Sequence, residues 1–167
     1  MPELRGERVV LRPAGHDDVD ALAAIRSTPE VWDRWLGDPR ADTVAAVDDP
    51  GLHYHVIELD GRVVGGIQWY EEEDPQYRHA GIDLFLDPSV HGQGLGADAI
   101  RTLARHVFDD HGHHRIVIDP AADNVAAIRC YEKVGFRPIG VMRRYEQGPD
   151  GSFHDGLLMD LLAEELT

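Results

Sequence analysis

Two stretches of the sequence combine residue types and spacings that could do chemistry. The first, residues 84–96, carries glycines at 92, 94 and 96 between a predicted strand and a predicted helix. Glycines at alternate positions let a backbone approach a ligand closely, and a helix start presents free N–H groups and a positive dipole end. The spacing fits neither a P-loop nor a dinucleotide-binding motif. It predicts a pyrophosphate site, the alternative being a Gly-rich turn that only begins a helix.

The second stretch lies about thirty residues further on and is predicted to be helical. Asn124 and Tyr131 are seven positions apart, so they lie on one face of that helix, two turns from each other. Ala127 lies between them and is small enough to leave room for a ligand. An amphipathic helix with Tyr131 packed in the core is the structural alternative. The two stretches together favour one ligand site.

The charge balance limits the possible partners. The 167 residues include 31 acidic and 16 Lys or Arg side chains, a net charge of −15. Binding to nucleic acid or to anionic membranes needs clustered cations, so a cationic partner fits better. A single cysteine, Cys130, allows no internal disulfide. With no apolar signal segment at the start and no long apolar run, we expect a cytoplasmic protein.

The remaining sequence predicts the elements that position these stretches. Strands and helices alternate, which indicates one α/β domain over residues 1–167. Asp60-Gly61 marks a hairpin, and residues 37–51 contain at most a short helical patch. The predicted strands are 8–12, 53–59, 62–70, 80–86, 115–118, 137–146 and 152–162. Two helices are predicted to begin near residues 17 and 28, and two more to span 96–111 and 125–134.

The two stretches resemble motifs of the GNAT superfamily of N-acetyltransferases. H-G-Q-G-L-G at 91–96 is similar to the family's acyl-CoA pyrophosphate loop, with His91 where Arg or Gln is usual. N-V-A-A-I-R-C-Y-E-K-V-G-F at 124–136 is similar to its second motif. The resemblance implies acetyl-CoA as donor and a mixed, mostly antiparallel sheet of six to seven strands, flanked by helices and splayed at the acyl-CoA site. The implied cofactor-binding residues are Leu84, Phe85, Leu86, His91, Gly92, Gln93, Gly94, Leu95, Gly96, Ala97, Asn124, Ala127, Tyr131 and Lys133.

Further stretches resemble the aminoglycoside 6'-N-acetyltransferases. They are W-Y-E-E-E-D-P at 69–75, A-G-I-D at 80–83, I-D-P at 118–120 and H-D-G-L-L-M at 154–159. The resemblance implies that Asp83 is the general base and that Tyr131 protonates the leaving thiolate. An acidic protein also suits a cationic acceptor amine. The implied substrate-binding residues are Trp69, Tyr70, Glu72, Asp83, Asp119 and Asp155.

Several alternatives stay open. The acceptor could be a protein N-terminus, a lysine or a polyamine, or the chain could be an acyl-CoA sensor without turnover. Asp155 could be a structural hydrogen-bond acceptor in the last hairpin. Direct transfer needs no nucleophile, so we expect none at Cys130, and the histidines at 111, 113 and 114 lack metal-ligand spacing. We therefore expect no metal, and either a monomer or a homodimer.

Overall fold

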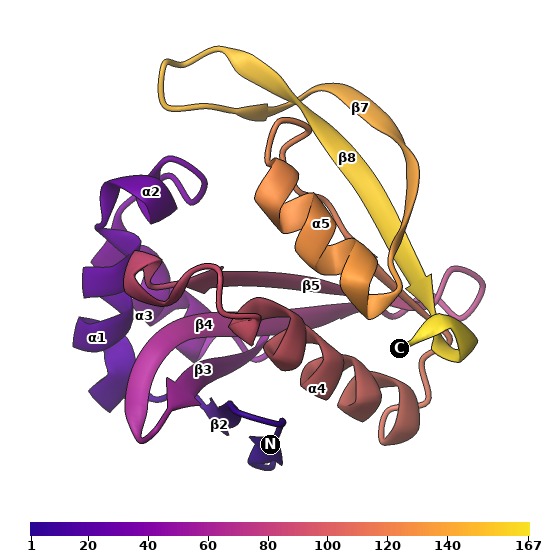
Figure 1. The fold of residues 1–167 in the computed structure, drawn as a ribbon, viewed down its shortest axis with the longest axis horizontal. Helices are drawn as coiled ribbons and strands as arrows, with labels where there is room; N and C mark the ends of the chain where they lie inside the picture. The colour runs from indigo at the N-terminus through magenta and orange to yellow at the C-terminus, as the bar shows by residue number, and fades with distance from the viewer.

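The computed structural model describes residues 1–167 and contains one mixed sheet of eight strands (Figure 1). Its order is β1-β2-β3-β4-β5-β6-β8-β7, and every neighbouring pair is antiparallel except β5 with β6. The mostly antiparallel sheet is thus confirmed, with β1 as a short addition to the predicted strands. The strands are β1 (Leu4–Arg5), β2 (Val10–Pro13), β3 (His53–Leu59), β4 (Arg62–Glu72), β5 (His79–Leu86), β6 (Arg115–Ile118), β7 (Arg137–Gln147) and β8 (Phe153–Leu162).

The helices divide between the two faces of the sheet. The larger apolar cluster packs α4 against strand residues such as Ile67 and Ile82, and a smaller one packs α1 and α2 against Tyr54 and Phe85. None of the helices is long and apolar enough to cross a bilayer. The helices are α1 (Val19–Arg26), α2 (Pro29–Trp32), α3 (Pro39–Asp48), α4 (Leu95–Asp109) and α5 (Val125–Val134).

One helix is longer than the sequence predicted. Residues 37–51 contain the ten-residue α3 rather than a short patch. The Asp38 carboxylate accepts the backbone N–H groups of Arg40 and Ala41, and Pro39 occupies the first turn, where its missing N–H costs nothing. The segment packs against α1. Its weak apolar periodicity hid a helix that is fixed by its cap and by this tertiary contact.

The sheet opens between β5 and β6. Only Ala80 and Gly81 of β5 pair with β6, whereas β5 stays paired with β4 as far as Leu86. Beyond Gly81, β6, β8 and β7 turn away from β5, and α5 lies on that side (Figure 1). The splayed sheet that the sequence predicted is therefore present, and one edge of β5 is left without a strand partner there.

Gly135, which follows α5, packs closely against the C-terminal segment. Its φ is +118°, and a Cβ there would lie 2.3 Å from the Glu165 carbonyl oxygen. Gly151 has a φ of +82° but open space around it. We expect Gly135→Ala to lower the free energy of unfolding by about 3 kcal/mol and Gly151→Ala by about 1 kcal/mol. Urea unfolding measures both, and equal losses would contradict the close contact.

Candidate active site

The glycine-rich loop joins β5 to α4 and is held open by contacts from outside it. Gly92 and Gly94 have φ values of +77° and +79°, and no atom lies within 4 Å of a Cβ built on either. The Arg8 guanidinium donates to the Gln93 carbonyl at 2.9 Å. Gly94 is the N-cap of α4 and brings no capping side chain, so the N–H groups of the first helical turn stay free to meet an anion.

A second anchor ties the N-terminal segment to α4. The Asp98 carboxylate accepts the backbone N–H groups of Glu7, Arg8 and Val9 at 2.8–3.0 Å. These bonds lower the pKa of Asp98 against the effect of its burial. They also bring Arg8 to the glycine-rich loop. Neither Arg8 nor Asp98 was predicted as a site residue, because no local sequence pattern pairs positions about ninety residues apart.

The unpaired edge of β5 presents its backbone to the opening. The Asp87 N–H donates to the Val64 carbonyl of β4. The N–H and C=O groups of successive residues in a strand point to alternate sides, so those of Leu84 and Leu86 point away from β4. The Leu86 carbonyl accepts the His91 Nε2–H at 2.9 Å. The Leu84 N–H therefore faces the opening, whereas the backbone of Phe85 faces β4.

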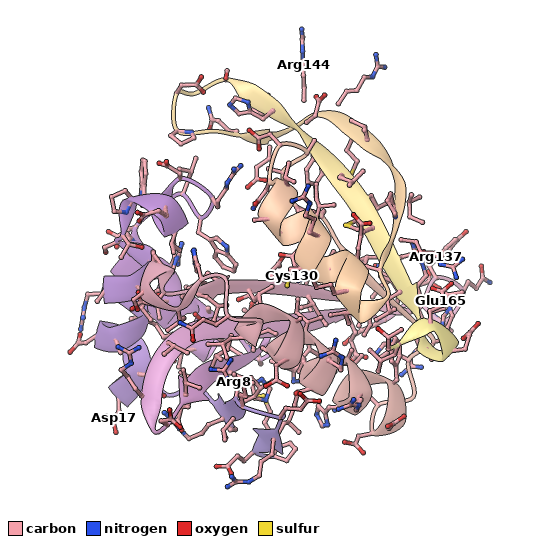
Figure 2. All side chains as sticks on the ribbon, viewed as in Figure 1. Arg8, Asp17, Cys130, Arg137, Arg144 and Glu165 are labelled. Carbon is pink, nitrogen blue, oxygen red and sulfur yellow. The ribbon has the colours of Figure 1, made fainter.

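The second motif forms α5 beside this edge. The Asn124 side chain caps the helix by accepting the Ala127 N–H at 3.3 Å. Tyr131 is buried, and Lys133 is exposed in the last turn. A Cβ at Gly96 would lie 3.2 Å from the Cys130 Sγ, so the start of α4 packs closely on α5 (Figure 2). The two motifs thus adjoin one another.

Asp83 lies on β5 just past the point where the sheet opens. It is half-buried, and burial, followed by the charges of Asp119 and Glu146, raises the pKa of its carboxyl group to about 6. A hydrogen bond from Gln68 opposes that rise. Burial, with smaller contributions from Cys130, Asp83 and Asp119, raises the pKa of Tyr131 above its usual value. A carboxyl group with a raised pKa and a buried phenol therefore lie close enough for the charge of Asp83 to affect the pKa of Tyr131.

Tyr145 and Glu146 join this cluster from β7 and were not predicted. The Tyr145 hydroxyl donates to Asp119 Oδ2 at 2.7 Å, and this bond raises the pKa of Tyr145 to about 12. Burial and the charge of Asp119 raise the pKa of Glu146, whereas Arg34 lowers it. Tyr145 and Glu146 lie beside Asp119 because the pairing of β7 with β8 is irregular. The apolar periodicity of a sequence does not reveal such a bulge.

The structure separates Trp69 from Tyr70. Tyr70 shares the Asp83 face of the sheet, and its ring lies over Gly81, where a Cβ would lie 2.2 Å from Tyr70 Cζ. Trp69 points to the opposite face, is 1% exposed and stacks on His53 at 4.0 Å between ring centroids. Strand alternation puts neighbouring residues on opposite faces, so only Tyr70 adjoins the acidic cluster.

Two predicted substrate-binding residues have structural partners. Glu72 is exposed on β4 and accepts the Asp74 N–H at 3.0 Å in the turn that follows. Asp155 on β8 accepts the Arg144 N–H at 2.9 Å, which agrees with the structural alternative for this residue. Neither contact points to an acceptor. Of the predicted substrate residues, the structure brings together Tyr70, Asp83 and Asp119.

The histidines lie around Trp69, away from this cluster. The ring nitrogens His106 Nε2 and His111 Nε2 are 3.2 Å apart, and His106 Nδ1 pairs with Asp110. His113 Nε2 lies 2.8 Å from Glu71 Oε2. No group of three or more His, Cys, Asp or Glu side chains is arranged to hold a metal ion.

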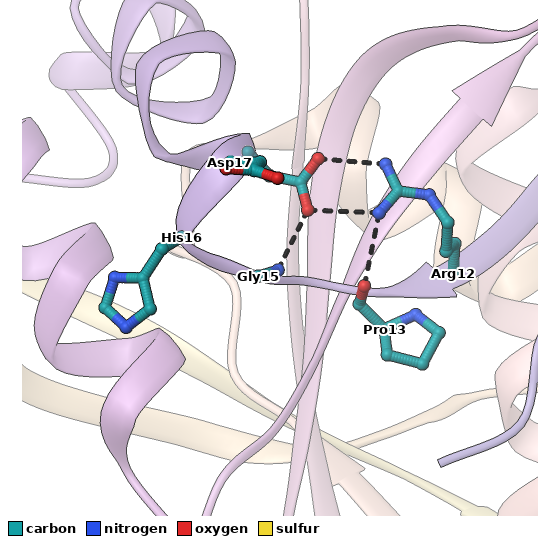
Figure 3. A pocket seen from close by; sticks show the side chains of 6 residues that line it. Arg12, Pro13, Gly15, His16 and Asp17 are labelled. Carbon is teal, nitrogen blue, oxygen red and sulfur yellow. Dashed lines mark hydrogen bonds and ion pairs between the residues drawn. The ribbon is translucent and has the colours of Figure 1, made fainter.

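A surface hollow at the end of β2 contains none of the predicted site residues (Figure 3). There the Arg12 guanidinium pairs with Asp18, which also accepts the Gly15 N–H at 2.8 Å. The pairing raises the pKa of Arg12 and lowers that of Asp18. The charges of Arg12 and Asp18 in this hollow are already paired with each other. The acidic cluster at the sheet opening is therefore the stronger candidate site.

Comparison with known proteins places the chain and its fold in a family. A model of the acetyltransferase (GNAT) domain matches residues 8–137. The aminoglycoside N(6')-acetyltransferase type 1 of Klebsiella pneumoniae is 31% identical over an alignment 166 positions long that covers 87% of this chain and 80% of that protein. The chain belongs to the GNAT acetyltransferase family, and it is an acyltransferase.

Solved structures agree with this assignment. Mycobacterium smegmatis RimJ in complex with CoA-disulfide superposes with a TM-score of 0.83 at 27% identity, covering 99% of this chain and 88% of that one. AAC(6')-Ib in complex with ribostamycin and coenzyme A superposes with a TM-score of 0.78 at 26% identity, covering 95% and 96%. The open α/β sheet flanked by helices is thus the fold of acetyltransferases whose structures hold coenzyme A.

Proposed function

We propose that the protein transfers an acetyl group from acetyl-CoA to an amine of an aminoglycoside, at the 6' position. The observation that carries this proposal is the meeting of Asp83, Asp119 and Tyr131 at the opening of the sheet. The Klebsiella relative and the ribostamycin complex support the acceptor class. The single thiol and the acetyl-CoA donor fit a protein that works in the cytoplasm.

The residues at the opening fit an acyl-CoA. The backbone groups of Leu84 and the Leu86 N–H on the unpaired edge of β5 can pair with the amides of the pantetheine arm. Gly92 and Gly94 leave the loop open for the pyrophosphate, and the uncapped start of α4 faces it. Acetyl-CoA supplies the acetyl group as an activated thioester.

Side chains of this protein would accept and donate the protons of the reaction. An amine attacks only when neutral, so Asp83 accepts its proton, directly or through a water molecule. The Leu84 N–H faces the opening and can donate to the oxygen on which negative charge develops. The Tyr131 hydroxyl is protonated at neutral pH and would give its proton to the departing sulfur. Exchange with solvent would then return a proton to Tyr131 and remove the one held by Asp83.

A panel of acceptors tests the proposal. Thiol release from acetyl-CoA would be followed with kanamycin, neamine, spermidine and an N-terminal peptide. Release with the aminoglycosides alone is expected, with the product's NMR spectrum showing acetylation at N6'. Release with peptide or spermidine alone would overturn the acceptor assignment. Coenzyme A binding without release in any reaction would instead favour a sensor.

The state of Asp83 predicts the pH dependence of this activity. Its carboxyl group must be ionised to accept a proton, and its pKa is raised to about 6. We therefore expect kcat/KM to fall as pH is lowered through about 6 and to level off above it. Initial rates between pH 5 and 8.5 would measure this, and a midpoint near 4 would contradict the buried environment of Asp83.

A further inference from the structure

The N-terminal segment is fastened to the start of α4 by one buried carboxylate. Asp98 is 7% exposed and accepts the backbone N–H groups of Glu7, Arg8 and Val9 at 2.8–3.0 Å. A Cβ on Gly6 would lie 2.7 Å from Asp98 Oδ1, so a glycine is needed for the segment to approach α4 this closely. The backbone at Arg8 is therefore held against the first turns of α4.

The Arg8 side chain extends from this anchor to the glycine-rich loop. Its guanidinium donates to the Gln93 carbonyl at 2.9 Å, and this is the only side-chain hydrogen bond to the backbone of residues 92–94. Gln93 lies between two glycines of positive φ, and no atom lies within 4 Å of a Cβ built on either. Glycines let the neighbouring peptide groups rotate easily, and packing does not restrain them here. The loop conformation therefore depends on the bond from Arg8.

The bond to Gln93 sets the direction of the next N–H group. The Gln93–Gly94 peptide is trans, so its C=O and N–H point to opposite sides. With the carbonyl turned toward Arg8, the Gly94 N–H points away from Arg8 and has no acceptor within the chain. Figure 2 shows Arg8 and Cys130 of α5 on opposite sides of the start of α4. The free N–H thus points toward the side of α5 and the opening, and a flipped peptide would present a carbonyl oxygen there instead.

We propose that Arg8 is a positioning residue for the acyl donor, because its bond to Gln93 holds the glycine-rich loop in the conformation that receives the pyrophosphate of acetyl-CoA. Gly6 and Asp98 act through Arg8 by fixing its backbone. A loop that is already ordered does not have to be ordered by the donor, which strengthens binding. The inference rests on the donor site of the proposed function and holds for any acceptor amine.

Arg8→Met tests this role, because it removes the bond to Gln93 and keeps an unbranched stem. Isothermal titration with coenzyme A should give a Kd about tenfold higher than for the wild-type protein. Arg8→Lys keeps a donor group and should recover part of the loss. Arg5→Met on β1 removes the same charge from a side chain that is 75% exposed. This matched control should leave the Kd within twofold.

A shortened donor tests whether the effect lies at the pyrophosphate. S-acetylpantetheine carries the same thioester and pantetheine arm without the pyrophosphate. In Arg8→Met, kcat/KM should fall about tenfold for acetyl-CoA, through KM, and less than twofold for S-acetylpantetheine. Equal losses for the two donors would contradict a role at the glycine-rich loop.

Nitrogen-15 relaxation distinguishes positioning from direct attraction between Arg8 and a phosphate. In the protein without coenzyme A, the N–H order parameters of Gly92 and Gly94 should be lower in Arg8→Met than in the wild-type protein, because the loop has lost the bond that orders it. A weaker Kd at unchanged order parameters would show that Arg8 acts on the donor itself. That result would overturn the positioning role.

Gly6→Ala tests the anchor. The new Cβ would displace the segment from Asp98, so the Kd for coenzyme A should again rise about tenfold. Adding Arg8→Met should weaken binding little further, because both changes act through one bond. Gly140→Ala, whose Cβ would meet nothing within 4 Å, is the matched control. Additive losses would show that Gly6 does not act through Arg8, and Arg8→Met remains a test if Gly6→Ala does not fold.

Titration with coenzyme A separates this inference from the proposed function. If the wild-type protein binds coenzyme A but acetylates no aminoglycoside, the acceptor assignment fails and the Kd comparison still tests Arg8. The same Kd for the wild-type protein and Arg8→Met would overturn the inference and leave aminoglycoside transfer intact. Absence of coenzyme A binding to the wild-type protein would overturn both.

Discussion

Asp83→Asn is expected to lower kcat by about 100-fold while the Kd for coenzyme A stays within twofold. Asparagine keeps the size and the polar surface of the side chain but cannot accept a proton from the amine. The side chain lies where β5 loses its β6 partner, and burial raises the pKa of its carboxyl group to about 6. Stopped-flow or steady-state thiol release gives kcat, and titration with coenzyme A gives the Kd.

The matched control is Asp60→Asn in the turn between β3 and β4. Asp60 is exposed with a φ of +52°, a conformation that asparagine also tolerates. Its rate should equal that of the wild-type protein. The low-pH fall of kcat/KM should also disappear in Asp83→Asn, because the group that titrates has been removed. An unchanged kcat in Asp83→Asn would exclude Asp83 as the base.

Most of the elements that build this site could be predicted from the sequence. The glycine-rich loop follows a strand and precedes a helix, and Asn124 to Gly135 carries both a cap residue and a C-terminal glycine. These signals are local, so pattern and capping rules detect them. The α3 helix escaped prediction because its cap and its packing on α1 outweigh a weak apolar pattern.

The cluster around Asp83 and Asp119 was predicted less completely. Tyr70 and Trp69 are adjacent in sequence, so strand alternation had to send one of them away from Asp83. Tyr145 and Glu146 reach Asp119 only because a register shift re-aims β7, and Arg144 is neither glycine nor asparagine to signal it. Local sequence patterns do not reveal long-range strand pairing or a bulge that is stabilised by a side chain.

Tyr131→Phe is expected to lower kcat by about 100-fold with little change in coenzyme A affinity. The ring is buried and packs near Phe136 at 6.1 Å between centroids, and phenylalanine keeps that packing. Only the hydroxyl proton is lost, and the departing thiolate must then leave without an acid. A matched control is Tyr77→Phe, whose ring is 70% exposed in the β4–β5 loop and whose rate should not change.

The leaving group distinguishes an acid from a packing residue. A thiol of lower pKa leaves readily without protonation. With an acetyl thioester of a more acidic thiol, the difference in kcat between Tyr131→Phe and the wild-type protein should therefore be smaller. If Tyr131 serves only to pack α5 against α4, the gap should be the same for both thioesters. The variant should then show a weaker Kd for coenzyme A or a lower unfolding midpoint in urea. A gap that narrows at unchanged Kd assigns the proton to the Tyr131 hydroxyl.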